Sequence, residues 1–177
     1  MTAERVHMFF KAMSQYAARI ASIICFPTTV TFVIVLLMQV LFRYVLKRPL
    51  EWYLEVVSIS YMWSLFMGIT LAFKGGSHIQ FQFLFNKLEG RIQRIIALAC
   101  QFIALIFFLY MLIYGVKLFN FSKDYILPTL LISQRWKFLC VPIAGGILAV
   151  HTMELIIGNV MDMLAHSDMR RDFYRRT

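Results

Sequence analysis

Long apolar stretches, separated by short charged clusters, set the pattern of this chain. Four predominantly apolar segments cover about residues 20–42, 54–73, 95–116 and 138–160. A helix rises about 1.5 Å per residue, so about 20 residues cross a hydrocarbon core of roughly 30 Å. The pattern therefore predicts an all-α integral membrane protein with four transmembrane helices in a single membrane domain.

Two further segments, at about residues 4–18 and 79–93, have the periodicity of amphipathic helices. Their apolar residues recur every three or four positions, with polar residues between them. Such helices lie along the membrane surface or against a partner. We predict interfacial helices here, and an extension packed on the chain's own bundle is the alternative.

Composition agrees with a membrane protein. Of the 177 residues, 60% are hydrophobic and only 15% are charged, whereas about a quarter are charged in a typical soluble domain. The net charge of +9 comes from Lys and Arg clustered beside the predicted spans, as is usual near lipid headgroups. No basic soluble module is present to bind nucleic acid, so we expect no nucleic-acid partner.

The distribution of basic residues predicts the orientation. The N-terminal segment, the second connection and the C-terminal tail together hold more Lys and Arg than the first and third connections. Because basic residues favour the cytoplasmic side, both termini are predicted to lie in the cytoplasm.

The residues that usually carry enzyme or cofactor chemistry are scarce. The three cysteines lie in or beside apolar runs without CxxC or Cys/His spacing, and only one of the four histidines lies within a span. A membrane oxidoreductase subunit would need redox cysteines or a second haem ligand. We therefore expect no enzyme activity, no cofactor and no metal on this chain.

His151 and Glu154 are the ionisable pair within the fourth span. At i and i+3 they share one helix face, and ionisable groups inside a membrane usually face protein or water. One hypothesis is a proton or ion site in a self-contained, homo-oligomeric transporter or channel. The other is a hydrogen-bonded structural pair, or a Glu that reaches the headgroups. We favour the second, because the uncharged stretches of the other spans hold no acid or base.

Two backbone features stand out within the spans. Pro27 falls near the start of the first apolar run, where the loss of a backbone hydrogen bond costs least. Gly145 and Ala149 have the small-xxx-small spacing that lets two helices approach closely.

The segment between the first two spans resembles a motif of a known transporter family. Phe42-Arg43 ends the first span, and Pro49-Leu50-x-Trp52 followed by Glu55 opens the second. Further similar features are Gly68, Ala72, Lys74 and His78 at the end of the second span, and Trp136 with Val141-Pro142 before the fourth. In this order they resemble the small membrane subunit of tripartite ATP-independent periplasmic (TRAP) transporters, the DctQ-like family. Leu54 and Gln82 stand where the family often has acids.

This resemblance implies a role as an auxiliary subunit in a bacterial inner (cytoplasmic) membrane. A periplasmic substrate-binding protein would deliver an organic acid, of the sialic acid or C4-dicarboxylate class, to a large membrane subunit. That large subunit would bind sodium and substrate and move by an elevator motion, while the small subunit enlarges its fixed scaffold. Arg43, Trp52, Glu55, Lys74, His78 and Trp136 would anchor helix ends at lipid or at the large subunit.

Overall fold

The computed structural model describes the backbone of residues 2–76 and 90–175, and the side chains of residues 8–75 and 95–160. In chain order the elements are α1 (Thr2–Tyr44), α2 (Tyr53–Gly76), α4 (Gly90–Phe121), the 3₁₀ turn η1 (Ser122–Asp124), α5 (Arg135–Phe138) and α6 (Cys140–Arg175). The described residues contain no β-strand, only an isolated bridge between Ile126 and Ser133.

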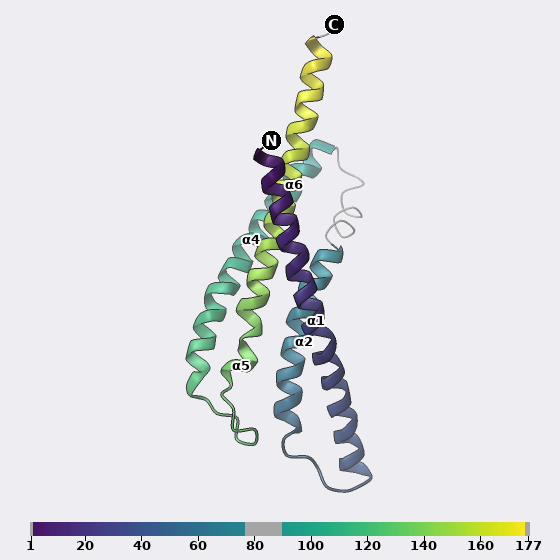
Figure 1. Ribbon diagram of the computed structural model, residues 1–177, viewed down its shortest axis with the longest axis vertical. Helices are drawn as coiled ribbons and strands as arrows, with labels where there is room; N and C mark the ends of the chain where they lie inside the picture. Colours follow the sequence, from purple (N-terminus) through teal and green to yellow (C-terminus); the bar gives the residue numbers. More distant parts are fainter. Residues whose placement is uncertain (1, 77–89, 176–177) are drawn as a thin grey trace.

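The predicted all-α membrane architecture is confirmed. Within the described residues, four helical segments are long and apolar enough to cross a membrane: Met8–Tyr44, Tyr53–Gly75, Ile95–Asp124 and Arg135–Val160. Both termini lie toward one end of the bundle, called here the terminal end (Figure 1). The connections 45–52 and 122–134 lie at the opposite end, called the loop end. Which end faces the cytoplasm stays a prediction.

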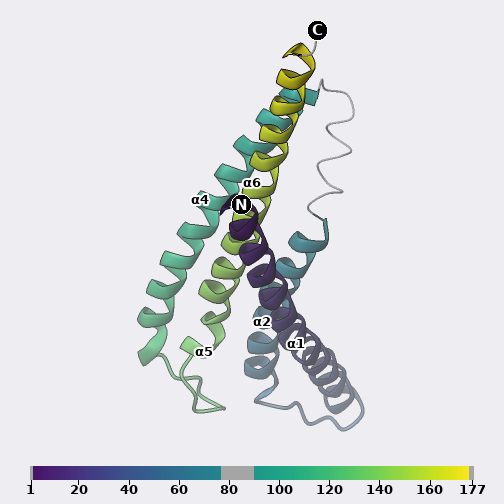
Figure 2. The same ribbon diagram turned by 45° about the horizontal axis from the view of Figure 1, so that its top comes forward.

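The helices associate as two hairpins joined through α6. Helix α1 packs along α2, and α4 packs along α6, while α6 also contacts both α1 and α2 (Figures 1 and 2). Helix α6 is therefore the central helix. In its membrane window 44% of residues are buried inside the protein, against 11% for both α1 and α4. The apolar surfaces of α1 and α4 are left for lipid or a partner.

Close contact between α4 and α6 depends on two glycines. A Cβ added at Gly145 would lie 2.9 Å from the backbone nitrogen of Leu112, and one at Gly115 would lie 2.9 Å from Pro142. Distances this short require a backbone or a ring to move, so only Gly fits at either position. Ala149, one turn after Gly145, is also buried. The expected close approach at Gly145 and Ala149 is confirmed, and it occurs within this chain.

Among the side chains that the structure describes, two clusters of buried residues form the core. The first joins Ala21 of α1, Met67 of α2, and Cys140 and Ala144 of α6. The second joins Phe108 of α4 to Leu148 and Ala149 of α6, with Phe73 of α2 packed against it. Small residues of α6 recur in both clusters, which explains how this helix can contact three others.

The segment 4–18, predicted as an interfacial helix, is helical and continues without a break into the first span. Ser14 is fully buried against the rest of the bundle, so this part of α1 packs on its own chain. The second predicted interfacial segment, 79–93, lies outside the described residues up to residue 89, and from Gly90 it belongs to α4.

Pro27 lies inside α1, not near its start, because the helix begins at Thr2. The expectation that it stands at a helix end was therefore wrong. The turn before it is supported by hydroxyl groups: Thr28 donates to the Ile24 carbonyl at 2.8 Å and Thr29 to that of Cys25 at 2.7 Å. Hydroxyl groups of this kind help a membrane helix to tolerate a proline.

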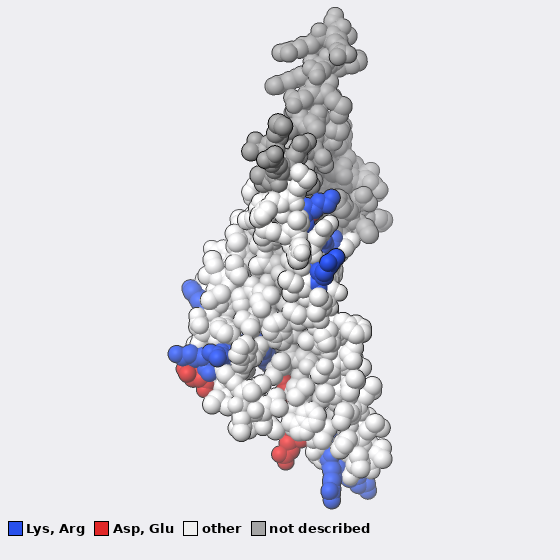
Figure 3. Space-filling model, in the orientation of Figure 1, with Lys and Arg blue, Asp and Glu red and all other residues white. Residues whose placement is uncertain are grey.

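Charged side chains are not confined to the two ends of the bundle. The face in Figure 3 has blue groups in its upper part, a blue group at mid-height on the left, and blue and red groups lower down.

Candidate functional site

Glu55 fastens the long connection between α4 and α5 to the start of α2. Its two carboxylate oxygens accept hydrogen bonds from the backbone N–H groups of Thr129 (2.9 Å) and Leu130 (2.7 Å). The side chain is buried, with 8% exposure. The next residue, Leu131, has a left-handed φ of 53°, a conformation that is uncommon away from Gly. Glu55 thus holds a tight turn in place.

A second buried polar side chain fastens the connection between α1 and α2. The side-chain oxygen of Gln39 accepts a 3.0 Å hydrogen bond from the backbone N–H of Leu50. Gln39 is 7% exposed and lies about one turn before the end of α1. Each connection at the loop end is therefore tied to a membrane helix by a side chain from that helix.

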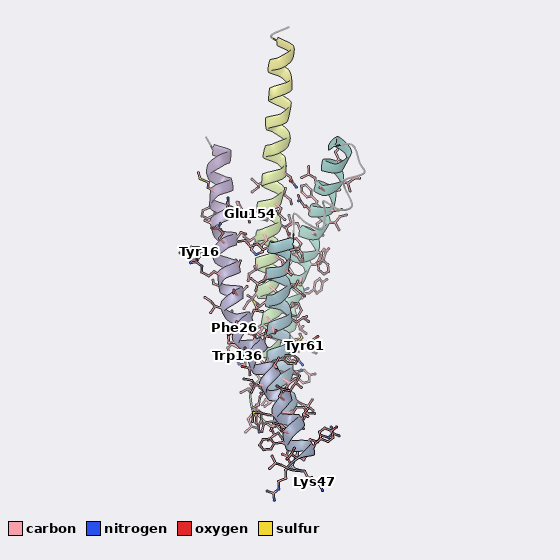
Figure 4. All side chains as sticks on the ribbon, turned by 90° about the vertical axis from the view of Figure 1, so that its right-hand side faces the viewer. Tyr16, Phe26, Lys47, Tyr61, Trp136 and Glu154 are labelled. Atoms are coloured by element: carbon pink, nitrogen blue, oxygen red, sulfur yellow. The ribbon has the colours of Figure 1, made fainter. Side chains whose placement is uncertain are left out.

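Aromatic residues join α2 to α5. The indole N–H of Trp63 donates to the backbone carbonyl of Trp136 at 3.0 Å. The guanidinium of Arg135 lies over the rings of Phe119 and Trp136, at 5.7 and 5.3 Å from their centroids. Figure 4 shows Trp136 at about the level of Tyr61, some way along α2. The short helix α5 is thus held against α2.

The other two predicted anchors of the loop end have simpler surroundings. Arg43 is exposed in the last turn of α1, with its guanidinium 5.9 Å from the ring centroid of Tyr44. Trp52 is half-buried, and its carbonyl accepts the N–H of Val56 at the start of α2. Both residues stand at helix ends, and their role as anchors stays a prediction.

His151 joins α6 to α1 near the terminal end. Its Nδ1 lies 2.7 Å from the hydroxyl oxygen of Ser14, and both residues are buried, at 1% and 0% exposure. The other ring nitrogen, Nε2, is buried and has no hydrogen-bond partner among the side chains and backbone that the structure describes. Either neutral tautomer leaves Nε2 unpaired. The bond connects residues 137 positions apart in the chain.

Glu154 lies one turn beyond His151 on α6 and is half-buried. Lys74 lies in the last turn of α2. The contact that joins two helices here is the hydrogen bond between Ser14 of α1 and His151 of α6. His78 lies outside the described residues.

The predicted site residues thus fall into two groups and not one. Arg43, Trp52, Glu55 and Trp136 belong to the loop end, and Lys74, His151 and Glu154 to the terminal end. Among residues 8–75 and 95–160, no three His, Cys, Asp or Glu side chains come together as a metal site would require. Trp136 and His151 each contact another helix, through Trp63 and Ser14, and Glu55 binds the connection between α4 and α5.

Sequence reasoning missed Ser14 and Gln39. Both are polar residues on an otherwise apolar helix face, and that pattern is the signal that could have found them. The predicted polar site within the spans contained only acids and bases, so the amide of Gln39 and the hydroxyl of Ser14 were left out. Thr29 and Ser64, whose hydroxyl oxygens lie 2.6 Å apart between α1 and α2, were missed for the same reason.

Comparison with known proteins gives consistent results. Residues 32–161 match the family model described as "Tripartite ATP-independent periplasmic transporters, DctQ component". The chain is 25% identical over 157 residues to the sialic acid TRAP transporter small permease protein SiaQ of Vibrio cholerae, covering 89% of this chain and 90% of that protein. It is also 25% identical over 109 residues to the sialic acid TRAP transporter permease protein SiaT of Haemophilus influenzae. That match covers 62% of this chain but only 18% of the relative.

Proposed function

Because the chain belongs to the DctQ component family of TRAP transporters, we propose that it is the scaffold subunit of a sodium-coupled importer of an organic acid. The chain is a multi-pass membrane protein and a small permease subunit, and the members of its family are transporter subunits and not enzymes.

The environment of Glu55 carries the proposal. Both of its oxygens are bonded to backbone groups of the chain's own connection, so this buried acid is already satisfied. A buried carboxylate used in this way holds a loop in place. The neighbouring anchors, Gln39 and Trp63, also bond to the chain's own backbone. These contacts support a rigid frame.

The expected partner is the large permease subunit. In the Haemophilus influenzae relative, the matched region is a small part of a much longer permease, so a similar segment there is covalently joined to the rest of that protein. This arrangement supports a separate large subunit packed against the present chain. The sodium and substrate sites would lie on that subunit, and this chain would hold no cofactor of its own.

The first substrate to test is a sialic acid, because the names of both relatives include it. A C4-dicarboxylate is the second. A periplasmic binding protein would deliver the acid to the two membrane subunits in the bacterial inner membrane, with both termini of this chain in the cytoplasm.

The test is uptake of labelled sialic acid or succinate in cells that express the binding protein, the large permease and this chain. We expect uptake that requires a sodium gradient and is lost when this chain alone is omitted. The large permease should also co-purify with an affinity-tagged copy of this chain. Uptake that continues in its absence would contradict the scaffold role.

Within the described residues Nε2 of His151 has no partner, and this observation favours the alternative, a self-contained transporter or channel. A buried polar atom without a partner calls for an explanation. The test is reconstitution of this chain alone in liposomes. The scaffold proposal expects no solute flux, whereas flux abolished by Glu154→Gln would favour the alternative.

A further inference from the structure

We draw no further inference here: the strongest candidate, the buried Nε2 of His151 at the contact between α6 and α1, belongs to the site already described, and nothing in the residues that the structure describes shows what it would bind.

Discussion

Helices α4 and α6 lie side by side, yet they differ in both apolar character and burial. Helix α4 belongs to the more apolar spans and α6 to the less apolar ones, but α6 has four times the buried fraction of α4. Large residues such as Ile103 and Phe107 cover the exposed surface of α4, whereas small and polar residues such as Ala144 and Thr152 are buried on α6. In a bilayer, apolar character does not indicate the core, because lipid is as apolar as a protein interior. The residues that indicate the buried core of a membrane bundle are instead the small and the polar ones.

Two neighbouring phenylalanines of α4 give the strongest test of this difference between buried and exposed residues. Phe108 is 8% exposed and packs edge-on against Phe73, with 5.4 Å between the ring centroids, while Phe107 is 61% exposed. We expect Phe108→Ala to lower the free energy of unfolding by about 3 kcal/mol, because it leaves a cavity. Phe107→Ala should cost less than about 1 kcal/mol. Denaturant unfolding in detergent, followed by circular dichroism, measures both, and equal losses would refute the contrast.

A second test concerns the polar contacts of the loop end. Glu55→Ala leaves the N–H groups of Thr129 and Leu130 unpaired, so we expect a loss of about 2–3 kcal/mol in unfolding free energy. Amide exchange in residues 122–134 should become faster, which mass spectrometry can follow. Glu55→Gln retains one acceptor oxygen, so its loss of unfolding free energy should lie between zero and that of Glu55→Ala. The control is the exposed Glu51, whose change to Ala should alter neither quantity.

The glycines of α6 offer a third test. Gly145→Ala forces a methyl group against the backbone of Leu112, and we expect a loss of about 2 kcal/mol in unfolding free energy. At Gly146 the added carbon would lie 3.8 Å from the Leu112 side chain, an ordinary contact. Gly146→Ala should therefore be neutral, or stabilising by up to about 1 kcal/mol through helix propensity. If both changes have the same effect, close backbone approach is not what fixes this interface.

The smallest effect is expected where α6 meets α1. Ser14→Ala removes one neutral hydrogen bond to His151, so we expect a loss of about 1 kcal/mol in unfolding free energy. Faster amide exchange in residues 8–19 should accompany it. Gln15→Ala, at an exposed neighbour, is the control. Unchanged exchange in the Ser14 variant would mean that other contacts hold the start of α1.

The sequence was sufficient to predict the four spans, because a bilayer demands a long apolar run wherever a helix crosses it. It also predicted the close approach at Gly145, since only small residues allow it. It did not predict which side of a span is buried. Within a span nearly every residue is apolar, so the periodicity that marks the core face of a soluble helix is lost.

The contacts of the candidate site were harder to predict. Glu55 was chosen from its place at a helix start, but its partners, Thr129 and Leu130, lie 74 and 75 residues away. No local pattern links positions so distant in the chain. The course of residues 4–18 was ambiguous for another reason: a helix has the same amphipathic pattern whether it lies on a membrane or packs on α6.

The unbroken length of α1 has a mechanical consequence. A helix of 43 residues is a rod of about 64 Å that passes from one side of the membrane to the other. A change in its tilt of about 5° would displace one end relative to the other by about 6 Å. Its loop end is clasped by Gln39 and its terminal part by Ser14, so such a rotation would strain both contacts at once. Helix α1 therefore connects the two sides of the membrane as a rigid rod, and the hydrogen bonds of Gln39 and Ser14 oppose a change in its tilt.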